Sequence, residues 1–125
     1  MAFKVLIVDD SPITRIMIRE MLETLGHQVV GEAESGRGGI DSFKSLKPDL
    51  MTLDISMPGK DGGKVYETLR MDPEIRAIRV CIVTGKPELR KLIYERPVPP
   101  PEGYLDKPVD EETLLRNVRK ILELA

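Results

Sequence analysis

Residues 48–62 read PDLMTLDISMPGKDG, and the fold can be worked out from this stretch outward. Pro48 ends a preceding helix, and the residues after it form an apolar run short enough for a buried strand. The run stops at Asp54, shortly before a predicted Pro58-Gly59 turn. A carboxylate is rarely buried without a partner, so Asp54 is expected either to face solvent or to meet a cation at the end of its strand.

Strand and helix patterns alternate on both sides of this stretch. Further strands are predicted at residues 4–8, 28–33, 79–83 and 104–105, and helices at 12–25, 36–46, 62–71, 87–95 and 110–122. The first strand is apolar on both faces, which is typical of a parallel sheet covered by helices on each side. The sequence therefore predicts an α/β fold of the flavodoxin-like (βα)5 type, a five-stranded parallel sheet in a three-layer sandwich.

Helical spacing also predicts which side chains reach the core. The expected inward residues are Ile13, Met17, Met21, Leu25, Ile40, Phe43, Leu46, Val65, Leu69, Leu89, Leu92, Ile93, Leu114, Leu115, Val118, Ile121 and Leu122, with Met51 in the central strand. Cys81 is expected to be a buried, inert thiol, and His27 an exposed turn residue after Gly26. The charged face of Arg70, Asp72, Glu74 and Arg76 is expected to be solvated.

Length and composition limit the classes of function. The 125 residues fit one domain, 1–125, with no output domain, and 41% of them are hydrophobic. A net charge of −2 gives no broad electrostatic reason to contact nucleic acid directly or to bind anionic membranes. No apolar run approaches the ~20 residues that a membrane span requires, so a cytoplasmic location is expected.

Polar residues stand where the predicted strands end: Asp9 and Asp10, Asp54, Thr84 and Lys107. Ligands of doubly wound sheets bind at the carboxyl ends of strands, and in the strand order 2-1-3-4-5 the first and third strands are neighbours. The three aspartates would then converge. Carboxylates so close together repel one another unless cations are present, and Mg²⁺ prefers oxygen ligands of this kind.

Such a site, with Lys107 added, can receive an anionic phosphoryl group. Asp54 is the candidate nucleophile, because its carboxylate can attack phosphorus to form an acyl phosphate. The adjacent Asp9 and Asp10 are placed to share the metal. Thr84 and Lys107 offer hydrogen-bond donors to the phosphoryl oxygens.

The chain resembles the receiver domain of response regulators, the CheY-like phosphoacceptor module of two-component signalling. The resemblance covers nearly the whole chain and rests on Asp9-Asp10, on Asp54 within LDISMPGKDG, on Val83-Thr84-Gly85, and on Tyr104-Leu105-Asp106-Lys107-Pro108. It implies a stand-alone signalling phosphoprotein rather than an enzyme with an external substrate. Asp54 would take its phosphoryl group from a histidine kinase or a histidine phosphotransfer protein, in a phosphorelay.

The resemblance also implies a metal set. Mg²⁺, for which Mn²⁺ can substitute, would be held by Asp10, Asp54 and the backbone carbonyl of Ser56, with Asp9 assisting. Ser56 and Lys86 stand at two positions that tune how long the phosphoryl group lasts.

The remaining implied roles concern the switch. Lys107 would contact the phosphoryl group, ahead of a cis bond to Pro108. Thr84 would turn inward on phosphorylation and Tyr104 would follow, changing a surface that a downstream protein reads.

One region departs from the family pattern. Residues 96–102, RPVPPPE, carry four prolines where receivers usually complete a fourth helix and a small Gly-Ala turn. This segment is either a rebuilt partner surface or a stiff loop that replaces part of a helix.

Other functions have weaker support in the sequence. A pseudo-receiver that keeps the fold but not the switch is the main alternative, although the full acidic site argues against it. A phosphohydrolase would want a second acid two residues after Asp54, where Ser56 stands. A nucleotide-binding flavodoxin-like protein would want a Ser/Thr/Gly phosphate loop in place of Asp9-Asp10.

Overall fold

The computed structural model describes residues 3–56 and 62–123. Strands and helices alternate as expected. The elements are β1 (Lys4–Val8), α1 (Pro12–Thr24), β2 (Gln28–Ala33), α2 (Gly36–Leu46), β3 (Leu50–Asp54), α3 (Gly62–Met71), β4 (Arg79–Thr84), α4 (Leu89–Tyr94), β5 (Gly103–Asp106) and α5 (Glu111–Glu123). The predicted Pro58-Gly59 turn lies outside the described residues.

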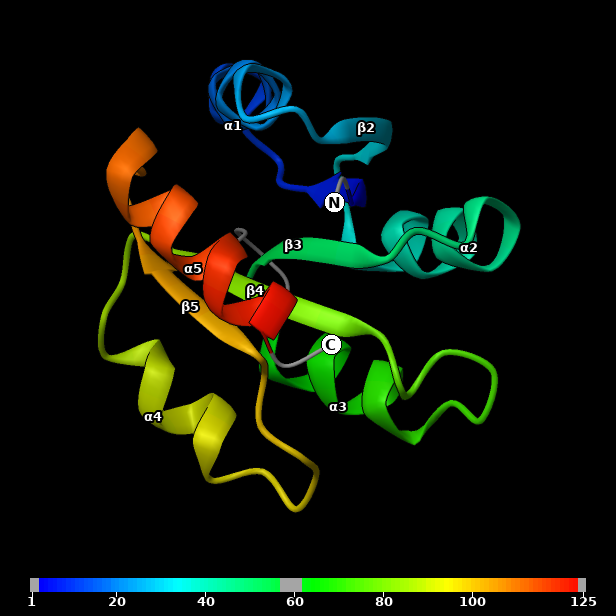
Figure 1. Ribbon diagram of the computed structural model, residues 1–125. Coiled ribbons are helices and arrows are strands. Elements are labelled where there is room, and N and C mark those ends of the chain that lie inside the picture. The colour runs from blue at the N-terminus through cyan, green and yellow to red at the C-terminus, as the bar shows by residue number, and fades with distance from the viewer. Residues whose placement is uncertain (1–2, 57–61, 124–125) are drawn as a thin grey trace.

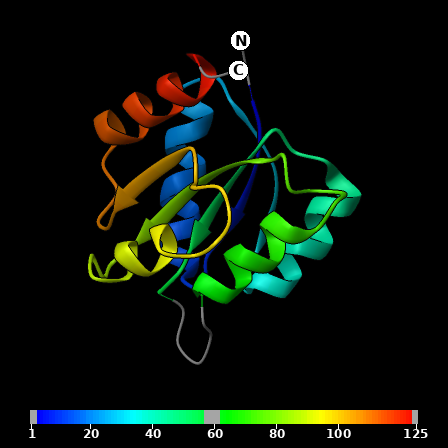
Figure 2. The same ribbon diagram turned by 90° about the horizontal axis from the view of Figure 1, so that it is seen from below.

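The five strands form one parallel sheet in the order β2-β1-β3-β4-β5, as predicted. Helices α1 and α5 cover one face, and α2, α3 and α4 cover the other (Figures 1 and 2). Each face has its own apolar core. One core centres on α1 and α5 and includes Ile18 and Val118, and the other includes Tyr66, Leu69 and Ile93.

Sequence signals explain where the helices begin and end. The Ser11 and Ser35 side chains accept hydrogen bonds from the backbone amides of Thr14 and Gly38, so these serines cap the N-termini of α1 and α2. Gly26 has a φ of +88°, a conformation that a side chain disfavours, and it ends the chain's first helical segment as expected.

The predicted inward face of α1 was wrong for Ile13 and Met17, whereas Met21 packs against the core as expected. Ile18 and Leu22 are the buried residues of this helix, whereas Ile13 is 70% exposed and Met17 is 40% exposed. The helix carries apolar residues around more than one face, and its Arg15 turns toward β2, so the rotation of the helix could not be read from the apolar spacing alone. An apolar patch consequently faces solvent.

Among the described side chains predicted to be buried in the other elements, most are buried and one is exposed. Phe43, Leu69, Ile93, Leu114, Val118 and Ile121 are buried, as is Met51. Leu46 is instead 42% exposed, because it lies at the end of α2 and only covers the backbone of Gly31. The side chains of Leu92 and Leu122 lie outside the described set.

His27 is buried rather than exposed. The residue is only 8% accessible, its Nδ1 accepts from the Phe3 amide at 3.0 Å, and its ring stacks on the Phe3 ring. The prediction of an exposed turn residue failed because the residue after Gly26 already begins to enter the sheet edge beside the first strand.

Arg70 is the second polar residue that the sequence misplaced. Its guanidinium is buried against Tyr66, Glu102 and the backbone carbonyls of residues 76, 78 and 100, so it belongs to the interior and not to a solvated face. Glu102 also accepts from the Val80 amide at 2.7 Å. The contacts join α3 to the entry of β5.

The proline segment, residues 96–102, is therefore docked on α3. Arg96 pairs with Glu67 at 2.7 Å and packs over the backbone of Gly63, while the Tyr66 hydroxyl donates to the Pro99 carbonyl at 2.6 Å. The segment is not helical, as predicted. Since the Pro99 and Pro100 carbonyls accept hydrogen bonds from α3 side chains, the segment is not presented as a free extended ligand.

Candidate functional site

The predicted site residues gather at the carboxyl edge of the sheet. Val8 of β1 pairs with Leu53 of β3, so Asp9 and Asp54 follow neighbouring positions on neighbouring strands. Asp54 pairs in turn with Val83, one residue before Thr84. The strand order expected from the fold class thus brings together groups that are far apart in sequence.

Three carboxylates form the centre of this edge. One oxygen from each of Asp9, Asp10 and Asp54 lies within 4.8 Å of the other two. Asp9 and Asp54 are each 1% exposed, whereas Asp10 is exposed. Two buried acids and one accessible acid therefore make a cluster of negative charge that solvent reaches at Asp10.

Lys107 supplies the opposing charge. Its Nζ lies 3.0 Å from Asp9 Oδ2 and 3.2 Å from Asp54 Oδ2. Its backbone amide donates to the Thr84 carbonyl at 2.8 Å, which fixes the start of the lysine beside β4, and the Lys107-Pro108 peptide bond is cis. The ammonium therefore bridges the two buried carboxylates.

The ionisation of this pair follows from burial and charge. Burial raises the pKa of Asp9 above its ordinary value of 3.8, and the hydrogen bond from the Ser11 amide and the charge of Lys107 do not fully offset that effect. Burial alone would lower the pKa of Lys107, but its contacts with Asp9 and Asp54 outweigh burial and raise it. The pKa of both partners therefore rises, that of Asp9 mainly because the carboxyl is buried and that of Lys107 because the ammonium reaches two acids.

Asp9 and Asp54 are each held by a local turn of the same type, in which the carboxylate accepts from the amide two residues later. Asp54 Oδ1 accepts from the Ser56 amide at 2.8 Å, and Asp9 Oδ1 accepts from the Ser11 amide at 2.8 Å. The Ser56 hydroxyl also donates to Asp54 Oδ1 at 2.6 Å. The sequence analysis missed these bonds, although the Asp-x-Ser spacing at both strand ends is a readable signal for them.

Thr84 ends β4 at the same edge, whereas Tyr104 lies inside β5, where it pairs with Ile82. The Thr84 hydroxyl is buried and bonded to the Lys86 backbone, accepting from its amide at 3.0 Å, so it does not bond Asp54 here. The Tyr104 ring lies under the Arg90 guanidinium, 4.4 Å from centroid to carbon. Burial, with the nearby Asp106 charge, raises the pKa of Tyr104 to about 12. Lys86 is exposed.

The donor set fits a hard divalent cation. The three acids offer oxygen ligands, and the buried Asp9 Oδ2 has no hydrogen-bond partner in the described part of the chain, since its contact with Lys107 is an ion pair without hydrogen-bond geometry. Asp9, Asp10 and Asp54 would hold such an ion. Oxygen-rich donors of this kind suit Mg²⁺ or Mn²⁺ rather than softer metals.

Comparison with known proteins agrees with the fold and this geometry. The family model described as response regulator receiver domain matches residues 5–119. Protein PilH of Pseudomonas aeruginosa is 41% identical over 119 residues, covering 95% of this chain and 97% of that protein. The chemotaxis protein CheY of Thermotoga maritima is 31% identical, covering 97% and 98%. The chain belongs to the response-regulator receiver domain family of two-component signalling.

Solved structures give the same result. The signal receiver domain of the putative response regulator NarL from Mycobacterium tuberculosis has a TM-score of 0.82 at 26% identity, with 98% of this chain and 97% of that chain covered. A CheY-like receiver domain from Methylobacillus flagellatus has a TM-score of 0.81 at 25% identity, with 97% and 99% covered. Members of this family are signalling domains, and they generally bind Mg²⁺ at an acidic cluster such as that of Asp9, Asp10 and Asp54. None of the helices in the described residues has the length and apolar character that a membrane crossing requires.

Proposed function

We propose that this protein accepts a phosphoryl group on Asp54 from a histidine kinase or a histidine phosphotransfer protein, in a reaction that depends on Mg²⁺. One observation carries the proposal. Asp54 lies within reach of two further carboxylates and of the Lys107 ammonium, at the carboxyl edge of a receiver-type sheet.

Each group has a task in the transfer. An Asp54 oxygen forms a bond to phosphorus while the bond between phosphorus and the donor's imidazole nitrogen breaks, and the electron pair stays on that imidazole. A bound Mg²⁺ would neutralise charge on the phosphoryl oxygens. Lys107, already in contact with Asp54, donates to one of these oxygens.

The donor protein is proposed to approach over α1. The exposed side chains of Ile13, Ile16 and Met17 form an apolar patch there. Beside it lies a hollow of about 300 Å³ whose lining includes Met17 and Lys107. Because the same lysine reaches Asp54, a donor helix packed on this patch would bring its phosphohistidine to the acceptor.

Phosphorylation is proposed to act as a switch through Thr84. Its hydroxyl now bonds the Lys86 backbone, and a phosphoryl group on Asp54 offers a stronger, charged acceptor. Tyr104, whose buried hydroxyl has no hydrogen-bond partner among the described residues, would respond to that movement. A downstream protein then reads the changed surface near α4 and β5.

The proposal is tested with a small acyl-phosphate donor such as acetyl phosphate. Intact-mass measurement is expected to show one phosphoryl adduct that hydroxylamine removes and that forms in Mg²⁺ but not in excess chelator. Amide spectra recorded in parallel are expected to shift at Thr84 and Tyr104. An adduct without any shift at these two residues would favour the pseudo-receiver, which keeps the fold without the switch.

A further inference from the structure

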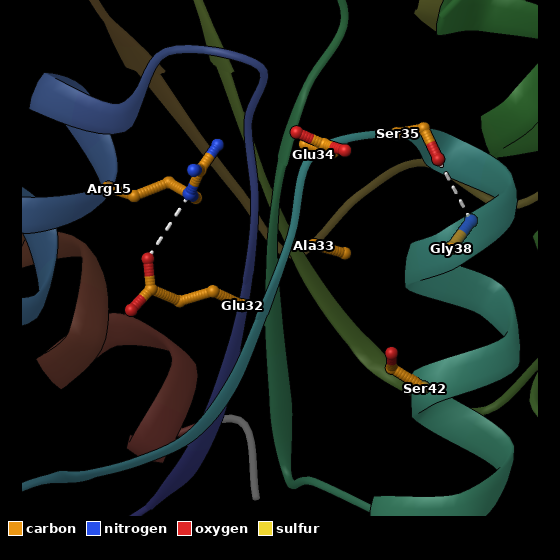
Figure 3. Close-up of a pocket in the computed structure, with 7 residues that line it drawn as sticks. All are labelled: Arg15, Glu32, Ala33, Glu34, Ser35, Gly38 and Ser42. Atoms are coloured by element: carbon orange, nitrogen blue, oxygen red, sulfur yellow. Dashed lines mark hydrogen bonds and ion pairs between the residues drawn. The ribbon is translucent and has the colours of Figure 1, made fainter.

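An ion pair between α1 and β2 also contacts the backbone of the turn at Asp9 and Asp10, which is called the acidic turn below. Arg15 of α1 donates from Nη1 to the Asp9 backbone carbonyl at 2.5 Å and from Nε to Glu32 Oε1 of β2 at 3.1 Å. Figure 3 shows Arg15 and Glu32 pointing toward each other along the wall of a hollow between α1 and α2. Neither side chain was selected in the sequence analysis.

Asp10 depends on the backbone for its position. No donor in residues 3–56 and 62–123 bonds the Asp10 carboxylate, although one of its oxygens faces the other two acids. Hydrogen bonds instead fix the backbone of Asp9, the residue before Asp10. The Asp9 amide donates to the Ala33 carbonyl at 3.0 Å, and the Asp9 carbonyl, which belongs to the peptide bond leading into Asp10, is held by Arg15.

Glu32 keeps the Arg15 guanidinium in place. The Arg15 side chain is 17% exposed and that of Glu32 is 29% exposed, so the ion pair is partly shielded from water. Glu32 is shared, because its other oxygen accepts from Arg19 at 2.7 Å. Arg19 lies one turn farther along α1 and has no described contact with Asp9, so only Arg15 connects Glu32 to the acidic turn.

We propose that Arg15, oriented by Glu32, is a positioning residue for the divalent cation site. It fixes the peptide between Asp9 and Asp10 so that the Asp10 carboxylate faces the ion. This inference rests on the proposed function only in that it requires the acidic cluster to bind a cation. It adds to the site two residues that do not contact the ion themselves, Arg15 of α1 and Glu32 of the edge strand β2.

Two effects of removing Arg15 oppose each other. Loss of a positive charge near the acids would by itself tighten cation binding through Coulomb attraction. Loss of the fixed peptide would weaken binding, and groups that orient metal ligands typically change affinity by about 10- to 100-fold. A weaker affinity in Arg15→Ala therefore reports positioning, since the electrostatic effect has the opposite sign.

The experiment measures Mn²⁺ binding, with Mn²⁺ standing in for Mg²⁺, from the electron paramagnetic resonance signal of the free ion. Arg15→Ala is expected to raise the dissociation constant by about tenfold. Arg19→Ala is the matched control, because it removes the same charge and the same type of contact to Glu32 without touching Asp9. It is expected to leave the dissociation constant unchanged or slightly lowered.

Arg15→Lys serves as the conservative variant and also covers the case in which Arg15→Ala does not fold. An ammonium cannot hold Asp9 and Glu32 in the fixed geometry of a guanidinium, so a smaller loss of the same sign is expected. Wild-type affinity in Arg15→Lys or Arg15→Ala, or an equal loss in Arg19→Ala, would overturn the inference. If the wild type binds no Mn²⁺, the proposed cation site itself fails, and the two failures are thereby distinguished.

Discussion

The substitution Arg70→Met tests whether the buried guanidinium holds the proline segment onto α3. It removes the ion pair with Glu102 at 2.8 Å and the bonds to the Tyr66 hydroxyl at 2.8 Å and to the Ile78 carbonyl at 2.6 Å. Methionine retains an apolar side chain of similar reach, so the loss is mainly of charge and hydrogen bonding. The acceptors that remain would be left without this donor.

The expected loss of unfolding free energy in Arg70→Met follows from how deeply the two partners are buried. The Arg70 side chain is 2% exposed, whereas that of Glu102 is 27% exposed and keeps the Val80 amide as a donor. Removing one partner of a buried ion pair typically costs about 3–5 kcal/mol of unfolding free energy. Because Glu102 is partly solvated, the lower end applies, and we expect a loss of about 3 kcal/mol. This is a large part of the ~5–15 kcal/mol that stabilises a domain.

Urea unfolding followed by circular dichroism measures the loss. Arg76→Met is the matched control, since Arg76 is exposed and the charge change is the same. It is expected to stay within about 0.5 kcal/mol of the wild type. A cycle of single and double variants with Glu102→Gln then isolates the coupling between the partners. A loss below about 1 kcal/mol in Arg70→Met, the size of one ordinary hydrogen bond, would refute the view that this network fastens the segment.

Three further predictions concern buried polar groups. Burial lowers the pKa of His27 below its ordinary value of 6.5, so the unfolded chain takes up the proton first as the pH drops. The unfolding free energy should therefore fall between about pH 6.5 and the folded-state pKa. Urea unfolding at a series of pH values should show that His27→Gln lacks this decrease. Burial raises the pKa of Cys81 to about 12, so an aromatic disulfide reagent should label this thiol only across the unfolding transition; labelling of the folded protein at neutral pH would argue against it. The Thr52 hydroxyl is buried without a hydrogen-bond partner among the described residues, so Thr52→Val should stabilise by about 1 kcal/mol in thermal unfolding, and a clear loss would indicate a missed partner.

The arrangement of the site could be predicted because it depends on topology. Each polar residue at a strand end was marked by an apolar run followed by a turn signal, and a parallel sheet places all such ends on one edge. Asp9, Asp54 and Lys107 were therefore brought together by an argument that needed no side-chain detail. In the structure, the Lys107 ammonium forms ion pairs with both Asp9 and Asp54, as this reasoning predicts.

Other features could not be predicted, because they depend on which way an element is rotated or on a contact with a distant segment. Apolar residues lie around more than one face of α1, so the spacing alone did not show that Ile18 rather than Met17 would be buried. Arg70 has the charge of a surface residue, and its burial depends on Glu102, which lies beyond the next strand. Arg15 was missed for a related reason, since its acceptor is the backbone of Asp9 and not a side chain.

The most direct test compares the wild type with Asp54→Asn after incubation with Mg²⁺ and a small acyl-phosphate donor. Intact-mass spectrometry, followed by peptide mapping, should find one hydroxylamine-labile phosphoryl group on Asp54 of the wild type and none on the variant. Asp10→Asn, which keeps Asp54 but removes a carboxylate proposed to hold Mg²⁺, should take up much less phosphoryl group in the same time. An unmodified wild type, or an equal adduct on Asp54→Asn, would show that Asp54 is not the phosphoacceptor.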